Sequence, residues 1–271
     1  MQRRQFIQLA QGGLISTLTA VGAIALDRNL SPAYAQKKPA NSAQKKPANS
    51  GGGSLSIEWL GHMSFLISGG GATILTHPFK PAGCTANKPQ PKASANLILI
   101  SSRLLDEGYL DGLPKNERVL TQPGSYNLQG LNIQGIRMDH DRLGGRRFGT
   151  NVAWRWQQAG IRILHLGGAA APIEADQRIL MGRPDVLIVP VGGGPKGYTA
   201  SEAQAVVNAL NPRIVIPMHY RTAKASNSCE LNSVDEFLTL MSGAKVQKLG
   251  GSSLQLTASS LPAPVSVKVF T

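Results

Sequence analysis

The sequence predicts a layered α/β domain over residues 55–270, and two features of this region indicate it. Its first half is a series of short β-rich runs that glycine-rich turns separate. In its second half, helical patterns alternate with short, continuously apolar runs, which are typical of strands buried on both faces. Hydrophobic residues make up 42% of the 271 residues, enough for one large packed core.

The expected elements follow in order along the chain. We expect strands at residues 55–60, 63–68, 72–76, 96–100, 119–121, 131–138, 152–156, 161–166, 186–191, 214–217, 246–249, 254–257 and 265–270. We expect helices at residues 102–110, 175–181, 201–210 and 234–241. Thr199, with Glu202 three residues later, has the pattern of a capping box before the third helix. By themselves these elements leave several topologies open.

The first 35 residues have the features of an export signal. Arg3 and Arg4 precede an apolar pair, which resembles a twin-arginine signal. An uncharged, weakly apolar stretch follows at 9–26, and Ala33-Tyr34-Ala35 has the small-x-small pattern of a cleavage site. We therefore expect an exported protein of the periplasm or thylakoid lumen, with cleavage favoured over retention as a membrane anchor.

Residues 36–54 are expected to be a disordered linker. The octapeptide AQKKPANS occupies residues 35–42 and is repeated at 43–50, and Gly51-Gly52-Gly53-Ser54 follows. Lys, Pro, Asn, Ser and Gly cannot bury a core. The signal has a net charge of +2 and the linker +4, so subtracting both from the total of +13 leaves +7 for residues 55–271.

This moderately basic domain favours a protein complex or an anionic partner in the exported compartment, although solubility alone would also explain the charge. We expect no nucleic-acid binding, because only Trp154-Arg155-Trp156 mixes aromatic with basic residues, and that run is predicted to be a strand. Membrane contact is expected only through an uncleaved signal or the basic linker.

The chain has two cysteines, Cys84 and Cys229. In an oxidising compartment such a pair can form a disulfide, and the spacing matches no metal motif. The sequence alone cannot place the two Cα atoms within bonding range, so the pairing is left open.

Several segments, in order along the chain, resemble the metallo-β-lactamase superfamily, in its lactonase-like and phospholipase-like hydrolase branch. The segment Trp59-Leu60-Gly61-His62-Met63-Ser64-Phe65 resembles the opening motif W-L-G-H-x-S-F. The other matching segments are 73–79, 96–102, 163–167, 184–194 and 216–220, the last of which contains the closing motif P-M-H-Y. The resemblance implies an αββα sandwich over residues 55–271. It also implies one or two divalent metals, held by an H-x-H-x-D-H loop, a middle His, a bridging Asp and a final His.

The chain departs from this ligand pattern at several positions. Asp106, His140 and His219 retain the family's Asp, middle His and final His. Glu107 stands where the loop has its last His, and Gly168 where the family has its bridging Asp. The remaining replacements are Ser102 and Leu104 for the first two loop histidines, and His77 for an early Asp that lies beside the ligands.

Counting ligands at these positions predicts a vestigial metal site made of Asp106, His140 and His219, with Glu107 as a substitute. One metal position keeps only His140, and the other keeps Asp106 and His219. If the resemblance is set aside, His140 and His219 are expected to be hydrogen-bonded core histidines. Asp106 and Glu107 are then expected to cap or solvate a short helix. His62 and His165 fall on positions that are not ligands, which predicts structural roles.

We therefore expect no catalytic residue and no cofactor, with zinc as the alternative. The expected function is that of a pseudoenzyme, a non-catalytic binding, accessory or assembly subunit. The alternative is a single-metal hydrolase of an ester, lactone or phosphodiester. A metal-free small-molecule binder is a third hypothesis, since no nucleophile motif such as G-x-S-x-G is present.

Overall fold

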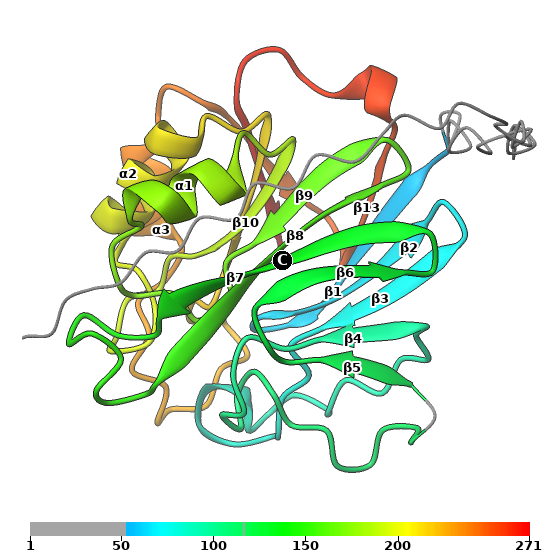
Figure 1. The fold of residues 1–271 in the computed structure, drawn as a ribbon. Helices are drawn as coiled ribbons and strands as arrows, with labels where there is room; N and C mark the ends of the chain where they lie inside the picture. Colours follow the sequence, from blue (N-terminus) through cyan, green and yellow to red (C-terminus); the bar gives the residue numbers. More distant parts are fainter. Residues whose placement is uncertain (1–52, 116) are drawn as a thin grey trace, which may run out of the picture. The chain divides into compact units, whose positions relative to one another are not determined.

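Two β-sheets pack face to face in the computed structural model, which describes residues 53–115 and 117–271 (Figure 1). The six-stranded sheet has the order β13-β1-β2-β3-β4-β5, and the eight-stranded sheet has the order β12-β14-β11-β10-β9-β8-β7-β6. The predicted export signal and all but the end of the predicted linker lie outside the described residues.

The strands of the six-stranded sheet are β1 (Leu55–Gly61), β2 (Ser64–Gly69), β3 (Ala72–Thr76), β4 (Leu97–Leu99), β5 (Arg118–Leu120) and β13 (Ser253–Leu256). Those of the eight-stranded sheet are β6 (Gly124–Leu128), β7 (Leu131–Asp139), β8 (Thr150–Gln158), β9 (Ile161–His165), β10 (Val186–Pro190), β11 (Ile214–Met218), β12 (Lys245–Leu249) and β14 (Ser266–Phe270). The α-helices of the described residues are α1 (Ala175–Met181), α2 (Ala200–Leu210) and α3 (Asp235–Leu240).

The pairing of the strands explains their composition. Strands β1, β2 and β3 form an antiparallel meander, as do β6 to β9, whereas β9, β10, β11, β14 and β12 run parallel. Every residue of β10 and β11 is buried, as expected for parallel strands covered on both faces. The sequence prediction of a mixed α/β fold with two sheets is thus confirmed.

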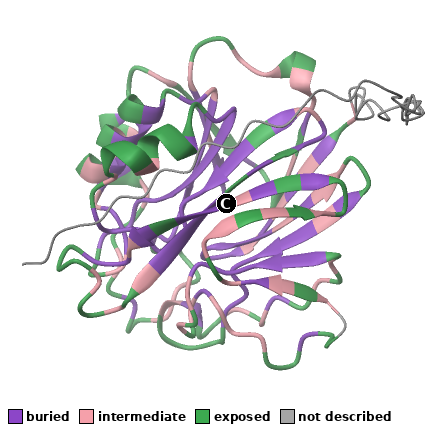
Figure 2. Cartoon of the chain, viewed as in Figure 1, coloured by how far each residue is buried: buried purple, intermediate pink, exposed green. Residues whose placement is uncertain are grey.

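The core lies between the two sheets, where the buried residues gather (Figure 2). Gln158 helps to join the sheets, because its buried side-chain amide donates to the carbonyl oxygens of Gly69 and Ala72 at 3.0 and 2.9 Å. The helices lie on the outer side of the eight-stranded sheet, where α2 contacts β10 and α1 contacts β7. At the start of α2, Thr199 and Glu202 form the predicted capping box.

The predicted helix at 102–110 is wrong, because this segment consists of turns. Its chain folds back on itself so closely that a Cβ on Gly108 would lie 1.9 Å from the carbonyl oxygen of Ser102. Leu110, at the end of this segment, and Leu113 pack on a small apolar cluster of the six-stranded sheet around Leu75 and Ile98. The chain after Gly108 therefore contributes to packing without forming a helix.

Strand β6 was not predicted, because Gly124-Ser125-Tyr126-Asn127-Leu128 has too few apolar residues to give a strand signal. It lies at the edge of its sheet, where pairing with β7 alone is enough to form it. Within the described part of the chain, no helix has the length and apolar character needed to cross a membrane.

Candidate metal centre

Two histidines lie immediately beyond the ends of strands. His62 follows β1 and His219 follows β11, and both have left-handed backbone conformations, with φ of 54° and 53°. Such values are uncommon for residues other than glycine and cluster at functional sites. The sharp turns end the strands and leave the two imidazoles next to each other, with ring centroids 4.6 Å apart.

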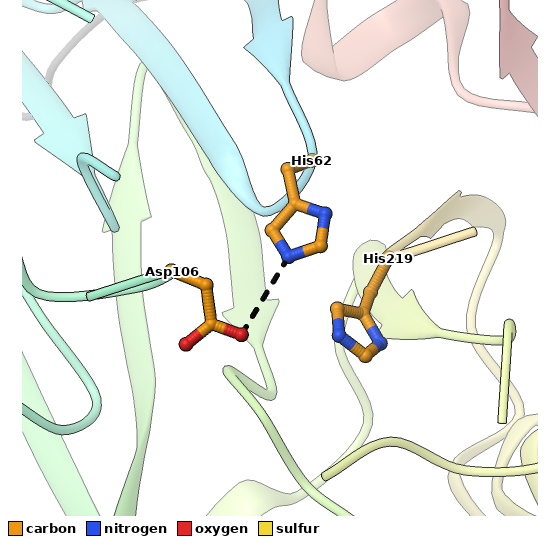
Figure 3. Close-up of side chains that lie close together, drawn as sticks. All are labelled: His62, Asp106 and His219. Carbon is orange, nitrogen blue, oxygen red and sulfur yellow. Dashed lines mark ion pairs between the residues drawn. The ribbon is translucent and has the colours of Figure 1, made fainter. Parts of the chain in front are cut away.

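Asp106 completes a cluster with these two histidines (Figure 3). It belongs to the turn-rich loop after β4, and its Oδ2 lies 3.9 Å from Nε2 of His62. One ligand atom from each of the three residues lies within 4.8 Å of the other two. Three segments that are far apart in sequence thus bring two imidazoles and a carboxylate together.

The donor atoms of this cluster fit a divalent metal. His62 and His219 are buried, yet Nε2 of His62, the atom that faces Asp106, has no hydrogen-bond partner among the described residues. A buried polar atom without a partner is costly, and a metal ion at the cluster would satisfy this one. Burial, helped by the nearby His62, holds the pKa of His219 well below its usual value, so this imidazole is neutral at pH 7, as a metal ligand must be.

Asp106 is ionised and already has a cationic neighbour. Burial would raise the pKa of Asp106, but His62 and the Lys196 ammonium together hold it well below its usual range. Nζ of Lys196 forms an ion pair with Oδ2 of Asp106. A metal at the cluster would therefore compete with Lys196 for this carboxylate.

The loop that carries Lys196 approaches His219 at two glycines. A Cβ on Gly192 would lie 2.2 Å from the carbonyl oxygen of His219, and one on Gly197 would lie 2.6 Å from its Nδ1. Side chains at these two positions would clash with the histidine. The glycines therefore allow the loop to form a wall of the site.

The cluster opens into a pocket of about 570 Å³, a size suited to a small molecule. His62, Asp106 and His219 all line it. The other lining residues are Lys80, Ala82, Gly83, Cys84, Thr85, Leu104, Leu105, Gly193, Gly194, Pro195, Lys196, Ser228, Glu230 and Leu231.

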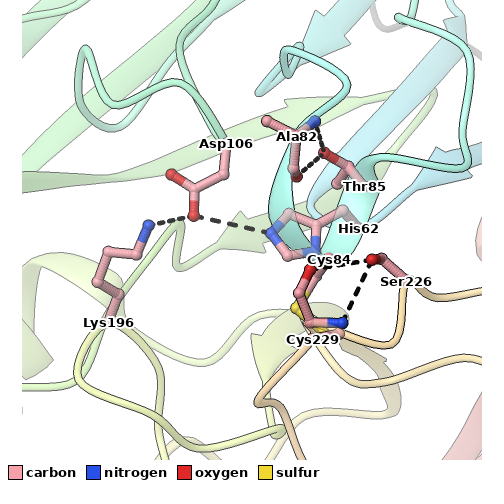
Figure 4. The surroundings of a disulfide bond; sticks show 9 residues. His62, Ala82, Cys84, Thr85, Asp106, Lys196, Ser226 and Cys229 are labelled. Carbon is pink, nitrogen blue, oxygen red and sulfur yellow. Dashed lines mark hydrogen bonds and ion pairs between the residues drawn. A yellow bond between two sulfur atoms is a disulfide. The ribbon is translucent and has the colours of Figure 1, made fainter.

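The Cys84–Cys229 disulfide lies at the edge of this pocket (Figure 4). The structure thus forms the bond that the sequence left open, with Cα atoms 4.4 Å apart and a sequence separation of 145. Each cysteine belongs to a loop that lines the pocket. The bond therefore holds two parts of the pocket wall together.

Glu107 and His140 form a second, fully buried cluster. Nε2 of His140 contacts Oε1 of Glu107, and the same carboxylate accepts hydrogen bonds from Ser101 and Ser102. Burial would lower the pKa of His140, but the hydrogen bond that its ring N–H donates to the Glu107 carboxylate raises it above its usual value. A Cβ on Gly168 would lie 2.5 Å from Oε2 of Glu107 and 2.6 Å from Cε1 of His140. The Glu107 carboxylate thus occupies the space that a side chain at 168 would need.

His77 and His165 form a stacked pair in the core, with ring centroids 4.0 Å apart. Nε2 of His165 donates to the Met63 carbonyl oxygen at 3.1 Å, and its Nδ1 accepts from the backbone N–H of Gly167 at 3.1 Å. Burial lowers the pKa of His165 to about 3 and that of His77 well below its usual value. Both rings are therefore neutral, and neither lines the pocket.

Of the site residues expected from the sequence, the structure brings Asp106 and His219 together in the candidate centre. It places His140 and Glu107 in the buried pair instead. His62, expected to be structural, is the third member of the centre. The sequence does place His62 directly after Gly61, at the end of a predicted strand. That the end of this strand lies beside the end of β11 is seen only in the structure.

The model of the β-lactamase superfamily domain matches residues 56–219. The chain belongs to the metallo-β-lactamase superfamily. A protein of Methanoculleus marisnigri named "UPF0173 metal-dependent hydrolase" is 25% identical over 200 residues, covering 63% of this chain and 83% of the relative.

Solved structures of the superfamily share this fold. A protein of Thermotoga maritima described as a Zn-dependent hydrolase is 31% identical, with a TM-score of 0.64 over 80% of this chain and 98% of that one. Igni18, a metallo hydrolase of Ignicoccus hospitalis, is 18% identical with a TM-score of 0.56, covering 75% of this chain and 98% of that one, a likeness that shows the fold alone.

These findings correct the expectation of a non-catalytic pseudoenzyme without a cofactor. That expectation counted ligands only at the superfamily's usual positions and therefore left out His62. The relatives are named metal-dependent hydrolases, and the described residues contain a three-ligand cluster. Both findings point to an enzyme and are compatible with a metal cofactor.

Proposed function

We propose that this chain is a single-metal hydrolase that cleaves an ester, a lactone or a phosphodiester. The observation that carries the proposal is the convergence of His62, Asp106 and His219 beneath a pocket. The names of the relatives support the hydrolase class.

Zinc is the metal that suits these residues best. Two imidazole nitrogens and one carboxylate oxygen are a frequent ligand set of catalytic zinc, which keeps one position open. When bound, zinc would supply Lewis-acid chemistry and lower the pKa of a water molecule near it. A second metal is not proposed, because the Glu107–His140 pair and Gly168 leave no side chain free to hold it.

Two lysines of the pocket provide positive charge that a substrate could bind. Lys80 and Lys196 both line the pocket, and Lys196 lies next to Asp106. With Asp106 holding a divalent ion, the Lys196 ammonium would be free to bind a negatively charged group of the substrate. This favours substrates that carry a carboxylate or phosphate near the bond to be cleaved.

The buried Glu107 holds the loop that presents Asp106. Its carboxylate accepts hydrogen bonds from Ser101 and Ser102 and contacts His140, so the residue next to Asp106 is fixed from three sides. Glu107 and His140 are fully buried and do not line the pocket. We assign them to positioning the loop.

The test is hydrolysis by the full-length chain loaded with zinc, with p-nitrophenyl acetate, an acyl-homoserine lactone and bis(p-nitrophenyl) phosphate as substrates. Asp106→Ala should reduce turnover by at least about 100-fold, since loss of even a partner outside the ligand shell costs roughly 10–100-fold. Asp111→Asn, at an exposed position that does not line the pocket, is the matched control and should leave turnover unchanged. Equal turnover by Asp106→Ala and the wild type would contradict the proposal.

We further propose that the enzyme works in an exported compartment. The twin-arginine pattern at Arg3 and Arg4 supports this, and the disulfide between Cys84 and Cys229 suits an oxidising environment. Fractionation of the producing cells, with mass spectrometry of the N-terminus, tests it. A mature N-terminus near Gln36 is expected, and recovery of the intact chain in the cytoplasm would contradict it.

A further inference from the structure

A second pocket, of about 510 Å³, is lined in part by residues that neighbour those of the metal centre in the sequence. Its lining shares no residue with the first pocket. Trp59 and Tyr220 belong to its wall, and they stand three residues before His62 and one residue after His219. Both pockets therefore adjoin the ends of β1 and β11.

The interior of this second pocket is apolar and aromatic. The Trp59 ring stacks against Tyr220 and Phe270, with centroids 5.9 and 6.1 Å away. Val234 and Val269 also line the pocket. Such a surface is suited to the flat or aliphatic body of a small molecule.

The rim of the second pocket is basic. Lys88, Arg221, Lys224 and Lys248 line it, against a single acidic side chain in the lining, that of Asp235. None of the ion pairs found among residues 53–115 and 117–271 involves these four bases. Their charges are thus available to a ligand.

Two of these bases, Lys88 and Lys224, line the pocket close enough for their charges to interact. Nζ of Lys88 lies 5.1 Å from the centroid of the Trp59 ring, which places a cation directly above the apolar surface. Burial lowers the pKa of Lys88, and the nearby Lys224 ammonium lowers it further. An anion placed between the two ammonium groups would relieve this repulsion.

We propose that this pocket binds a small molecule with an apolar body and one anionic group, such as an aryl or acyl carboxylate, sulfonate or phosphate. The body would lie against Trp59 and Phe270, and the anionic group would lie between Lys88 and Lys224. The proposal does not depend on the metal centre, because no residue of that centre lines this pocket.

The test is calorimetric titration of the metal-free full-length chain with 8-anilinonaphthalene-1-sulfonate, compared with neutral 1-anilinonaphthalene and with inorganic sulfate. The anionic aromatic probe should bind with a stoichiometry of one and at least about tenfold more tightly than either comparison compound. The Lys88→Gln/Lys224→Gln chain should bind it about tenfold more weakly, as expected for the loss of two partly exposed charges.

Two further variants make the result specific to this pocket. Ala223→Trp places a bulky side chain at an exposed position of the lining and should block the probe without disturbing the core. Lys92→Gln/Lys115→Gln removes two exposed lysines that line neither pocket and should leave binding unchanged. Unaltered binding by Ala223→Trp, or an equal loss in both lysine pairs, would overturn the proposal.

Discussion

The backbone N–H of His219 donates a hydrogen bond to the carbonyl oxygen of His62 across 3.4 Å. This contact joins the end of β11 in one sheet to the end of β1 in the other and brings the two imidazoles together. The same carbonyl oxygen accepts from Nε1 of Trp59 at 3.2 Å. The contact between the two sheets therefore positions the two histidines of the metal centre, and the loop after β4 positions Asp106.

Replacing Lys196 should strengthen metal binding. Its ammonium pairs with Asp106 and repels a cation at the cluster, so Lys196→Met should raise the affinity for zinc by roughly tenfold at low salt. Competition with a fluorescent zinc chelator measures the affinity. Lys92→Met, at an exposed position away from the pocket, is the control. A weaker affinity in Lys196→Met would show that Lys196 assists the metal and does not compete with it.

A side chain at position 168 should destabilise the fold. The Cβ of Gly168→Ala would overlap Glu107 and His140, which predicts a loss of about 1–3 kcal/mol in the free energy of unfolding. In a Glu107→Ala background the same substitution should cost less, because the overlapping carboxylate is gone. Urea denaturation of the four chains gives the coupling energy, and additive effects would contradict the described contact.

Removing the disulfide should lower stability and loosen the pocket. The Cys84→Ser/Cys229→Ser chain should lose about 2–4 kcal/mol, since the bond closes a long loop in the unfolded chain. Thermal unfolding of the oxidised wild type, the reduced wild type and the double variant measures the effect. The reduced wild type and the variant should behave alike, and identical melting of all three samples would exclude a stabilising bond.

Acid should destabilise the domain through His165. Its pKa is about 3 in the folded state, below the usual 6.5, so between these values the unfolded chain binds a proton that the folded chain does not. The contribution is fully present above pH 6.5 and is lost as the pH falls, by about 2 kcal/mol at pH 5. Urea denaturation at pH 7.5 and pH 5 should show this loss in the wild type and a smaller one in His165→Gln. An equal loss of stability in the wild type and in His165→Gln would show that groups other than His165 cause the acid effect.

The sequence predicted the strands and the superfamily well, because buried parallel strands such as β10 and β11 have continuous apolar runs. It failed where packing overrides local pattern. The segment at 102–110 has a helical composition, but Gly108 allows a tight return that no helix could make. Edge strand β6 depends on its partner and has little signal of its own.

Only part of the candidate site could be predicted, because one of its three residues depends on contacts between distant segments. Asp106 and His219 fall on ligand positions of the superfamily, so a motif comparison found them. His62 does not, and its role depends on a contact between two sheets that no local pattern encodes. The pairing of Glu107 with His140 likewise depends on the space above Gly168, which only the fold reveals.

The most direct test of the account is the zinc content of the purified full-length chain and of His62→Ala, measured by elemental analysis after zinc loading and gel filtration. His62 is the decisive residue, because it is a ligand in the proposed centre but does not fall on one of the superfamily's usual ligand positions. We predict about one zinc per wild-type chain, the same in Asp111→Asn, and a loss of at least about 100-fold in affinity in His62→Ala, consistent with removal of one of three protein ligands. No zinc in the wild type, or an unchanged zinc content and affinity in His62→Ala, would contradict the account.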